Sequence, residues 1–371
     1  MSLYIDIHAL HTVPPSNINR DDTGAPKTAT FGGVVRQRVS SQAWKRAIRK
    51  DFEQYLQPEQ LGWRTKRVVE KAVKQIEQIA PDWEKKRAVD GVVKVLEAAG
   101  IKPATPKKKD EEAEDPLPEA TYLLFLSAHQ IRRVAEYVVE NDGVKPGKKD
   151  AAKLLDQEHS VDIAMFGRMV ADAPDYNVDA AIQVAHALGV APAEPEFDYY
   201  TAVDDVVEDA EETGAGMIGT VQMMSSTLYR YATVNLAQLE ENLASKEAAA
   251  EAVAAFVQSF ITSMPTGKQN SYANRTMPEA VVVSVRNDRP ISLVNAFEEP
   301  VEATTSRSRR QEAATRLAAE GKNITETYSA PAVRTWVLAL ADVREALQEL
   351  GESVTKDELI EQLTGLLREE A

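Results

Sequence analysis

Residues 14–50 read PPSNINRDDTGAPKTATFGGVVRQRVSSQAWKRAIRK and form a basic stretch inside an acidic protein. The stretch holds eight lysines and arginines against two aspartates, a formal charge of +6, whereas the 371-residue chain carries −15. An acidic protein has no general attraction for polyanions, and in physiological salt a charge acts over only about 8 Å. The stretch is therefore typical of a local site that binds a phosphate backbone.

The N-terminal flank of this stretch predicts a strand followed by a loop. From Leu3 to Ala9 apolar residues alternate with polar ones, the period of two that a strand with one buried face shows. From there to Val39 the sequence is rich in Pro, Gly and Asp and includes the pair Gly32-Gly33. Such residues favour turns, so we expect a long ordered loop, and loops of this length are usually functional or disordered.

The C-terminal end of the stretch predicts an amphipathic helix. Ser40 or Ser41 is a suitable N-cap, and apolar residues then recur at spacings of four, four and three. The four basic residues between 45 and 50 fall on the other side of this helix, so one face is expected to pack while the other is cationic. The apolar positions are Trp44, Ile48, Phe52 and Tyr55.

Composition narrows the class of protein further. The chain has no cysteine, which excludes disulfides, zinc–thiolate sites and cysteine nucleophiles. The N-terminus lacks the basic and unbroken apolar segments of a secretion signal, and no apolar run reaches the roughly 18 residues of a membrane helix. We therefore expect a soluble, cytoplasmic protein without membrane partners, built as one elaborated domain or as two.

The middle of the chain has a different pattern. Apolar residues at helical spacing predict an inserted helical subdomain over residues 57–190. A tract rich in Pro and charged residues, 103–119, interrupts this subdomain and is expected to form a mobile loop. The expected helices are Val68–Ile79, Lys86–Ala99, Tyr122–Val139, Ala151–Val170 and Val178–Leu188.

Residues 191–371 return to strand patterns. Runs at Phe197–Val207 and Met217–Val234 predict a long hairpin. A helix at Lys246–Thr262 and a buried strand at Ala280–Val285 follow. Together with the first strand and helix, this order is βαββαβ, the ferredoxin-like arrangement of RNA-recognition folds. The predicted fold class is thus α+β, with peripheral helices beyond Pro331.

Five separated blocks of the sequence resemble one family. They are SNINRDDTGAPKTATFGG with RVSSQAWKRAIR, VDIAMFGRM (161–169), YYTAVDD (199–205), LYRYATVNLAQL (228–239) and TGKQNSYA (266–273). In this order they are similar to the CasC family, the guide-RNA-binding backbone subunits of Cascade, the type I-E CRISPR surveillance complex. The resemblance covers most of the chain, and five blocks are far more specific than a single motif.

The resemblance implies a non-catalytic subunit with an RRM/ferredoxin-like palm, helical fingers and a thumb hairpin. The palm would comprise residues 1–56 and 191–371, the fingers 57–190 and the thumb 198–227. In the family, copies assemble head to tail along CRISPR RNA and present it for pairing with target DNA, next to other Cascade subunits. No cofactor and no metal are expected.

Sequence-independent binding of RNA requires cationic side chains at phosphates, with N–H and hydroxyl donors from a loop and a helix N-terminus. Gly32 and Gly33 would let the backbone approach the RNA. Arg36 and Arg38 are instead expected to pair with acids elsewhere. An ordinary solvated helix face is the alternative, which the preceding Gly-rich loop makes less attractive. The candidates are Asn17, Arg20, Lys27, Ser40, Gln42, Lys45, Arg46 and Arg49, with Lys268 and Asn270 from the last block.

Two adjacent carboxylates, Asp21 and Asp22, suggest a competing function. Such a pair can hold a divalent cation that activates water, as in the related type III backbone subunits that cleave RNA. The simpler interpretation assigns these carboxylates to the turn at Thr23 and to the orientation of Arg20. The histidines show no metal-ligand spacing. A metal-dependent RNase and a general RNA-binding protein thus remain as alternatives.

The family comparison also suggests residues that wedge beside bases. These are Thr201 and Val203 on the thumb and Met169 in the fingers, although a methionine at helical spacing is more often part of a core. Acidic residues at 208–212 make the thumb tip unsuited to phosphate. Four finger lysines are candidates for contact with target DNA or for an ordinary solvated surface: Lys145, Lys148, Lys149 and Lys153.

Overall fold

The computed structural model describes residues 3–108, 115–170, 172–202 and 217–369. The chain divides into two compact units. The first, here called the sheet unit, comprises Met1–Phe52, Gln183–Asn235 and Val253–Ala371. The second, the helical unit, comprises Glu53–Ile182 and Leu236–Ala252.

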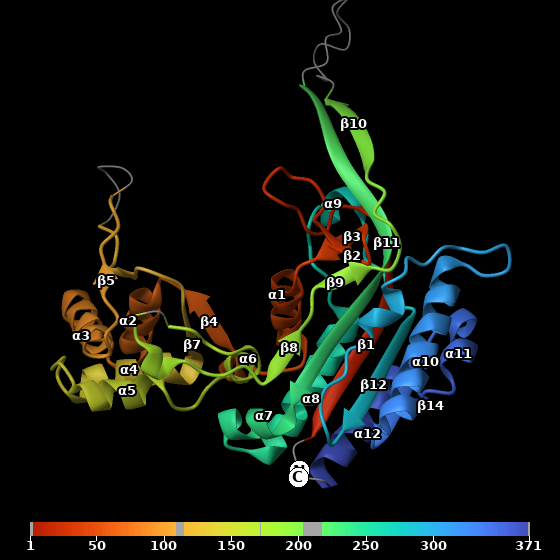
Figure 1. Ribbon diagram of the computed structural model, residues 1–371. Coiled ribbons are helices and arrows are strands. Elements are labelled where there is room, and N and C mark those ends of the chain that lie inside the picture. The colour runs from red at the N-terminus through yellow and green to blue at the C-terminus, as the bar shows by residue number, and fades with distance from the viewer. Residues whose placement is uncertain (1–2, 109–114, 171, 203–216, 370–371) are drawn as a thin grey trace, which may run out of the picture. The chain divides into compact units, whose positions relative to one another are not determined.

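The sheet unit is built on a large, mostly antiparallel sheet (Figure 1). Its hydrogen-bonded order is β14-β13-β12-β1-β11-β9-β3-β2, and β8 and β10 also pair with β11. β1 is central, antiparallel to both β11 and β12. The strands are β1 (Tyr4–Ser16), β2 (Thr28–Phe31), β3 (Val34–Val39), β8 (Ile182–Val184), β9 (Ala187–Gly189), β10 (Glu196–Ala202), β11 (Met217–Asn235), β12 (Ala280–Arg286), β13 (Arg334–Ala339) and β14 (Glu352–Ser353).

Apolar clusters cover both faces of this sheet. On one face Val13 and Leu228 pack with Trp44 of α1; on the other, Leu10 and Val282 pack with side chains of α10 and α11. The expectation of one solvated face on the first strand is therefore wrong, because the α10 layer covers the polar positions as well. The helices are α1 (Ser41–Asp51), α8 (Lys246–Thr262), which begins in the helical unit, α9 (Gln269–Tyr272), α10 (Arg309–Tyr328), α11 (Ala341–Leu347) and α12 (Lys356–Glu369).

The expected long loop before α1 is instead mostly strand. β1 continues to Ser16, and β2 and β3 form a hairpin whose two-residue turn is Gly32-Gly33. Both glycines have positive φ, +58° and +74°, the requirement of a type I′ turn. The irregular part of the stretch is thus confined to residues 17–27.

The two glycines of this turn are expected to differ in their tolerance of a side chain. A Cβ on Gly32 would collide with the carbonyl oxygen of Glu298, whereas a Cβ on Gly33 meets nothing within 4 Å. Gly33→Ala should cost about 1–2 kcal/mol of folding free energy, from the left-handed backbone alone, and Gly32→Ala about 2 kcal/mol more. Urea denaturation of both variants measures the difference; equal losses would contradict the close approach to Glu298.

β10 and β11 form the predicted long hairpin, paired from Glu196↔Met223 to Ala202↔Met217. β11 is 19 residues long and continues without a break into the sheet, where it pairs with β1. Figure 1 shows the β10–β11 ribbon projecting beyond the rest of the sheet. The acidic residues expected at its tip lie outside the described residues.

The helical unit has its own apolar core, formed chiefly by α2, α3 and α4. Of its expected helices, Val178–Leu188 is wrong, because residues 182–184 and 187–189 are the strands β8 and β9 of the large sheet. The expected helix Ala151–Val170 is instead two short helices, and residues 124–127 of the expected helix Tyr122–Val139 form the strand β7. The ends of the tract 103–119 pair as β5 and β6. The elements are β4 (Gly62–Thr65), α2 (Val68–Ile79), α3 (Lys85–Ala98), β5 (Pro103–Ala104), β6 (Glu119–Ala120), β7 (Leu124–Ser127), α4 (Ala128–Glu140), α5 (Lys148–Leu155), α6 (Val161–Phe166) and α7 (Leu236–Leu243).

Candidate nucleic-acid interface

Helix α1 is fixed firmly on the sheet unit. Ser40 caps it: the Ser40 hydroxyl accepts a hydrogen bond from the backbone N of Ala43 at 3.2 Å. Trp44 and Ile48 are fully buried, as the apolar spacing predicted. The guanidinium of Arg230 on β11 stacks on the Trp44 ring, 3.7 Å from its centroid. The helix therefore presents its remaining face in a defined orientation.

The loop at residues 17–27 is held by hydrogen bonds of two polar side chains, the buried Asn17 and the exposed Asp21. The amide of Asn17 donates to the carbonyl oxygens of Gly24 (2.9 Å) and Gln222 (3.0 Å), and its side chain is fully buried. The Asp21 carboxylate accepts hydrogen bonds from Thr23, N and Oγ1, and from the N of Ala25. These bonds, first that from the Thr23 hydroxyl, lower the pKa of Asp21. Asn17 and Asp21 thus shape the loop.

Arg36 is a structural residue. Its guanidinium is fully buried and donates to four carbonyl oxygens, those of Gly189, Val190, Phe297 and Glu298, at 2.9–3.2 Å. The expected pairing with an acid is wrong, because backbone carbonyls replace the carboxylate. Arg38 likewise donates to the carbonyl of Thr28 at 3.1 Å.

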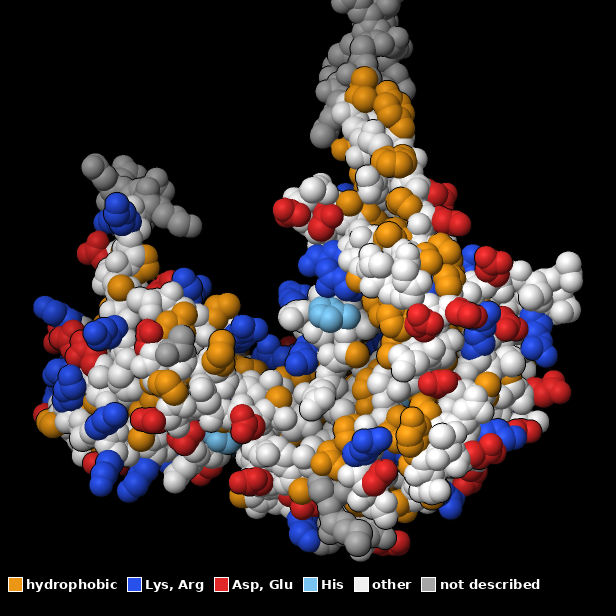
Figure 2. All heavy atoms as spheres, viewed as in Figure 1, with side chains coloured by type: hydrophobic (Ala, Val, Ile, Leu, Met, Phe, Trp, Pro, Cys, Tyr) orange, Lys and Arg blue, Asp and Glu red, His pale blue; other side chains and the backbone are white. Residues whose placement is uncertain are grey.

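The candidate cations differ in accessibility. Arg20 and Arg46 are exposed and Lys27 is partly exposed, and none of the three forms an ion pair within the described ranges. Lys45 and Arg49, expected on a fully exposed face, are half-buried and have partners. Burial lowers the pKa of Lys45. Figure 2 shows lysine and arginine side chains gathered where Figure 1 places β2 and β3.

A histidine that sequence reasoning did not single out also belongs to this surface. His186 Nδ1 accepts a hydrogen bond from the backbone N of Ser41 at 3.2 Å and lies 3.4 Å from Nη1 of Arg38. Burial, followed by the positive charges of Arg38 and Lys27, lowers the pKa of His186. The neutral His186 ring therefore accepts a hydrogen bond from one of the backbone N–H groups that have no partner within the first turn of α1. Sequence spacing could not indicate this contact.

The loop before β12 packs on the same region. A Cβ on Gly267 would collide with the carbonyl of Ile18, so the two loops touch through their backbones. Gly267 and the 18–24 loop line a hollow of about 580 Å³. Lys268 next to it is half-buried with left-handed backbone, while Gln42 and Asn270 are exposed. The structure thus places most of the predicted candidates of the sheet unit on these two loops and α1, whereas Gly32 and Gly33 lie in the β2–β3 turn and Thr201 on β10.

One face of the β10–β11 hairpin carries exposed aromatic and apolar side chains (Figure 2). Phe197, Tyr199 and Thr201 alternate along β10, and Thr201 lies opposite Ile218. Phe197, Tyr199 and Ile218 are each at least 60% exposed, which is unusual for side chains of this size. Thr201 is exposed too. The predicted candidate Val203 lies outside the described residues.

Met169 of the helical unit projects from a well-anchored loop. Its side chain is 81% exposed, so it is not part of a core. Its neighbour Arg168 is buried and donates to the carbonyl of Tyr176 at 2.7 Å. Val170 N donates to Asn177 at 2.7 Å. Hydrogen bonds therefore hold the residues on both sides of Met169, while the Met169 side chain itself is exposed to solvent.

In the described part of the chain, no three His, Asp or Glu side chains are grouped as ligands of a metal ion. No described helix is long and apolar enough to cross a membrane.

Comparison with solved structures defines the class of fold. A chain of a "CRISPR RNA-guided surveillance complex, pre-nicking" matches with a TM-score of 0.81 and 33% identity, over 98% of this chain and 100% of that chain. A chain of a "CRISPR RNA-guided surveillance complex" matches with a TM-score of 0.75 and 29% identity, over 97% and 99%. This protein thus has the mixed α/β fold of those subunits. The model of the CT1975-like protein family matches residues 5–364, and the chain belongs to this family. No curated protein matches it.

Proposed function

We propose that this protein is a non-catalytic backbone subunit of a Cascade complex, of the type I-E CasC kind. It binds CRISPR RNA, assembles head to tail with copies of itself and presents the guide for pairing with target DNA. The observation that carries the proposal is the match, over nearly the whole chain, to a subunit of an RNA-guided surveillance complex.

The strand order supports an RRM/ferredoxin-like palm. The sequence of elements β1, α1, β9, β11, α8, β12 is βαββαβ, and the sheet order β12-β1-β11-β9 is the 4-1-3-2 order of that fold. The second strand is the short β9 rather than β10, which belongs to the projecting hairpin. We assign the palm to the sheet unit, the fingers to the helical unit and the thumb to β10–β11.

The RNA surface is assigned to the sheet unit between the 17–27 loop and α1. Arg20, Lys27 and Arg46 supply cations without ion-pair partners in the described ranges, and Gly33 leaves the hairpin turn open. Lys45 and Arg49 add charge from a half-buried position. The backbone of this surface is held in place by Asn17, Ser40 and Gly32. Bases of the RNA would contact the exposed side chains of Thr201 and Met169.

Isolation from cells that express the full complex provides the direct test. We expect RNA that co-purifies with this protein to be enriched in CRISPR guides and to be protected at regular intervals, because each copy covers an equal length of strand. Sequencing the bound RNA after nuclease digestion measures both properties. RNA of unrelated sequence without periodic protection would favour a general RNA-binding protein instead.

The nuclease alternative is separated by substitution of the two loop carboxylates. Asp21→Asn with Asp22→Asn should leave strand cleavage unchanged, because Asp21 is engaged by Thr23 and Ala25 rather than free to hold a cation. Guide RNA with complementary RNA or DNA, incubated with magnesium or manganese, provides the assay. Cutting by the wild type that the double variant abolishes would show a metal-dependent RNase.

A further inference from the structure

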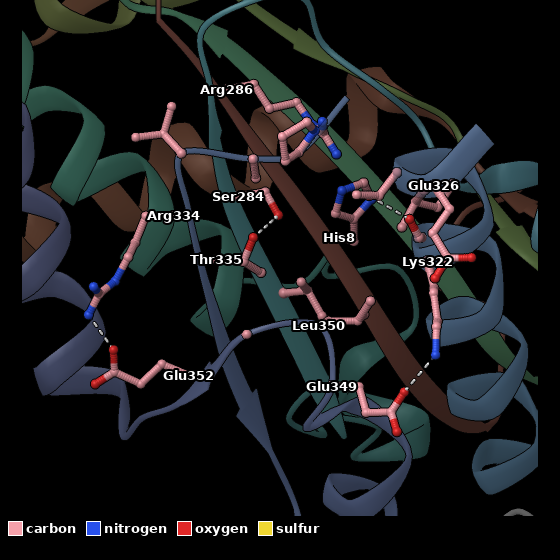
Figure 3. Close-up of a pocket in the computed structure, with 18 residues that line it drawn as sticks. His8, Ser284, Arg286, Lys322, Glu326, Arg334, Thr335, Glu349, Leu350 and Glu352 are labelled. Atoms are coloured by element: carbon pink, nitrogen blue, oxygen red, sulfur yellow. Dashed lines mark hydrogen bonds and ion pairs between the residues drawn. The ribbon is translucent and has the colours of Figure 1, made fainter. Parts of the chain in front are cut away.

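A cavity on the α10 side of the sheet takes no part in the proposed RNA surface. Its volume is about 640 Å³, within the range of small-molecule sites. It lies between β1, β12, β13, α10 and the segment that joins α11 to β14 (Figure 3). None of the candidate RNA-contact residues lines it.

The sheet face under this cavity changes from apolar to polar along its strands. Leu10, Val282 and Val337 belong to the apolar core beneath α10 and α11. Further along β1 and β12 the same face carries Asp6, Ser284 and Arg286, each at most 6% exposed. Burial of such groups lowers stability unless hydrogen bonds compensate it. A sheet face whose only role was to pack against α10 would not need these buried polar side chains.

His8 presents a ring nitrogen to this cavity. Its Nδ1 lies 2.9 Å from the Tyr229 hydroxyl, which also accepts a hydrogen bond from the backbone N of Leu293 at 3.0 Å. Burial lowers the pKa of His8 to about 3, so the ring is neutral. No described residue bonds to the other ring nitrogen, Nε2.

A pair of hydroxyls adds to this ring nitrogen. Ser284 Oγ and Thr335 Oγ1 lie 3.1 Å apart on adjacent strands at the cavity wall (Figure 3). Together they offer one hydrogen and several lone pairs to a ligand. Apolar side chains of Val282, Leu293 and Leu350 flank these groups.

The charges of the wall cancel in pairs. Arg286 lies 3.3 Å from Asp6, Lys322 pairs with Glu349, and Arg334 pairs with Glu352. Glu326 on α10 also lines the cavity and has no ion pair among the described residues. A phosphate would therefore find no uncompensated cation in the cavity. A neutral polar ligand needs no such cation, so the paired charges do not disfavour its binding.

We propose that this cavity binds a nucleobase. A base is a flat, neutral ring with donors and acceptors along its edge, which match Nε2 of the neutral His8 ring and the hydroxyls of Ser284 and Thr335. Its faces are apolar and suit the flanking Val282 and Leu350. Either a free nucleoside or an unpaired base of an RNA strand can supply it, and the site does not depend on the proposed RNA surface.

Calorimetric titration of the full chain with adenosine, guanosine, cytidine and uridine tests the proposal. At least one nucleoside should bind saturably, and inorganic phosphate at least about tenfold more weakly, because the wall offers it no uncompensated cation. Ser284→Ala with Thr335→Val should weaken nucleoside binding about tenfold through the lost hydrogen bonds. Leu350→Trp should abolish it by filling the cavity. Thr364→Val on α12, whose hydroxyl bonds only within its own helix, is the matched control.

The outcomes separate the sources of the base. Competition by a short RNA that the hydroxyl variants abolish assigns the site to a base within a strand; competition by free nucleosides alone assigns it to a metabolite. No binding of any nucleoside up to about 10 mM, phosphate binding as tight as nucleoside binding, or unchanged binding by a folded Ser284→Ala/Thr335→Val protein would each overturn the proposal. RNA binding at the α1 surface should be unaffected by Leu350→Trp, so the two assignments fail independently.

Discussion

Arg36→Met is expected to destabilise the protein by about 3 kcal/mol or more, whereas Arg38→Met on the same strand should cost less than about 1 kcal/mol. The fully buried Arg36 guanidinium donates to four carbonyl oxygens, which the substitution would leave without these donors. Arg38 is only half-buried, and it donates to the carbonyl oxygen of Thr28 alone among backbone carbonyls of the described residues. Urea denaturation followed by circular dichroism measures both losses.

Arg36→Lys provides a sharper comparison. Lysine keeps the charge but lacks the planar fork that reaches carbonyls on two sides, so most of the stability should still be lost. Amide exchange should accelerate around residues 187–190 and 297–298, where the carbonyl partners lie. Equal stabilities of Arg36→Met and Arg38→Met would refute the structural role of Arg36.

Helix α1 could be predicted from the sequence because its signals are local. The spacing of Trp44, Ile48 and Phe52 sets one buried face, and Ser40 supplies a cap within three residues of its partner. The β2–β3 hairpin was not predicted, although Gly32-Gly33 between Phe31 and the β-branched Val34 is a local signal for a two-residue turn. Helix α10 was missed because it buries mostly small residues, Ala313, Ala314 and Gly321 with Leu317, so its apolar stripe is weak.

The candidate site was predicted in outline but not in the role of each side chain. Residue type and charge predict that the stretch 14–50 binds a polyanion, and Arg20 and Arg46 are exposed, as this prediction requires. Asn17 and Arg36, however, are buried by partners about 150 residues or more away in sequence, at Gln222, Gly189 and Val190. Such long-range contacts leave no mark on local spacing, and neither does the bond of His186 to the start of α1.

Removal of the exposed cations together should weaken RNA binding strongly. For Arg20→Ala, Lys27→Ala and Arg46→Ala combined we expect affinity for single-stranded RNA to fall on the order of 100-fold at low salt, with each charge-assisted contact contributing about 1 kcal/mol. The slope of log K against log salt should flatten by about 2 units, since three phosphate contacts would release fewer counterions. Fluorescence anisotropy over a series of salt concentrations measures both quantities.

A variant with the same change in net charge provides the control. Arg307, Arg310 and Lys356 each pair with a carboxylate in the sheet unit, away from the 17–27 loop and α1 in sequence. Their combined replacement by Ala also removes three positive charges, so it lowers any non-specific attraction of RNA by a similar amount. If RNA follows the surface of α1 and the 17–27 loop, this control keeps nearly the wild-type slope. Equal flattening in both triple variants would mean that the net charge of the protein, rather than this surface, governs RNA binding.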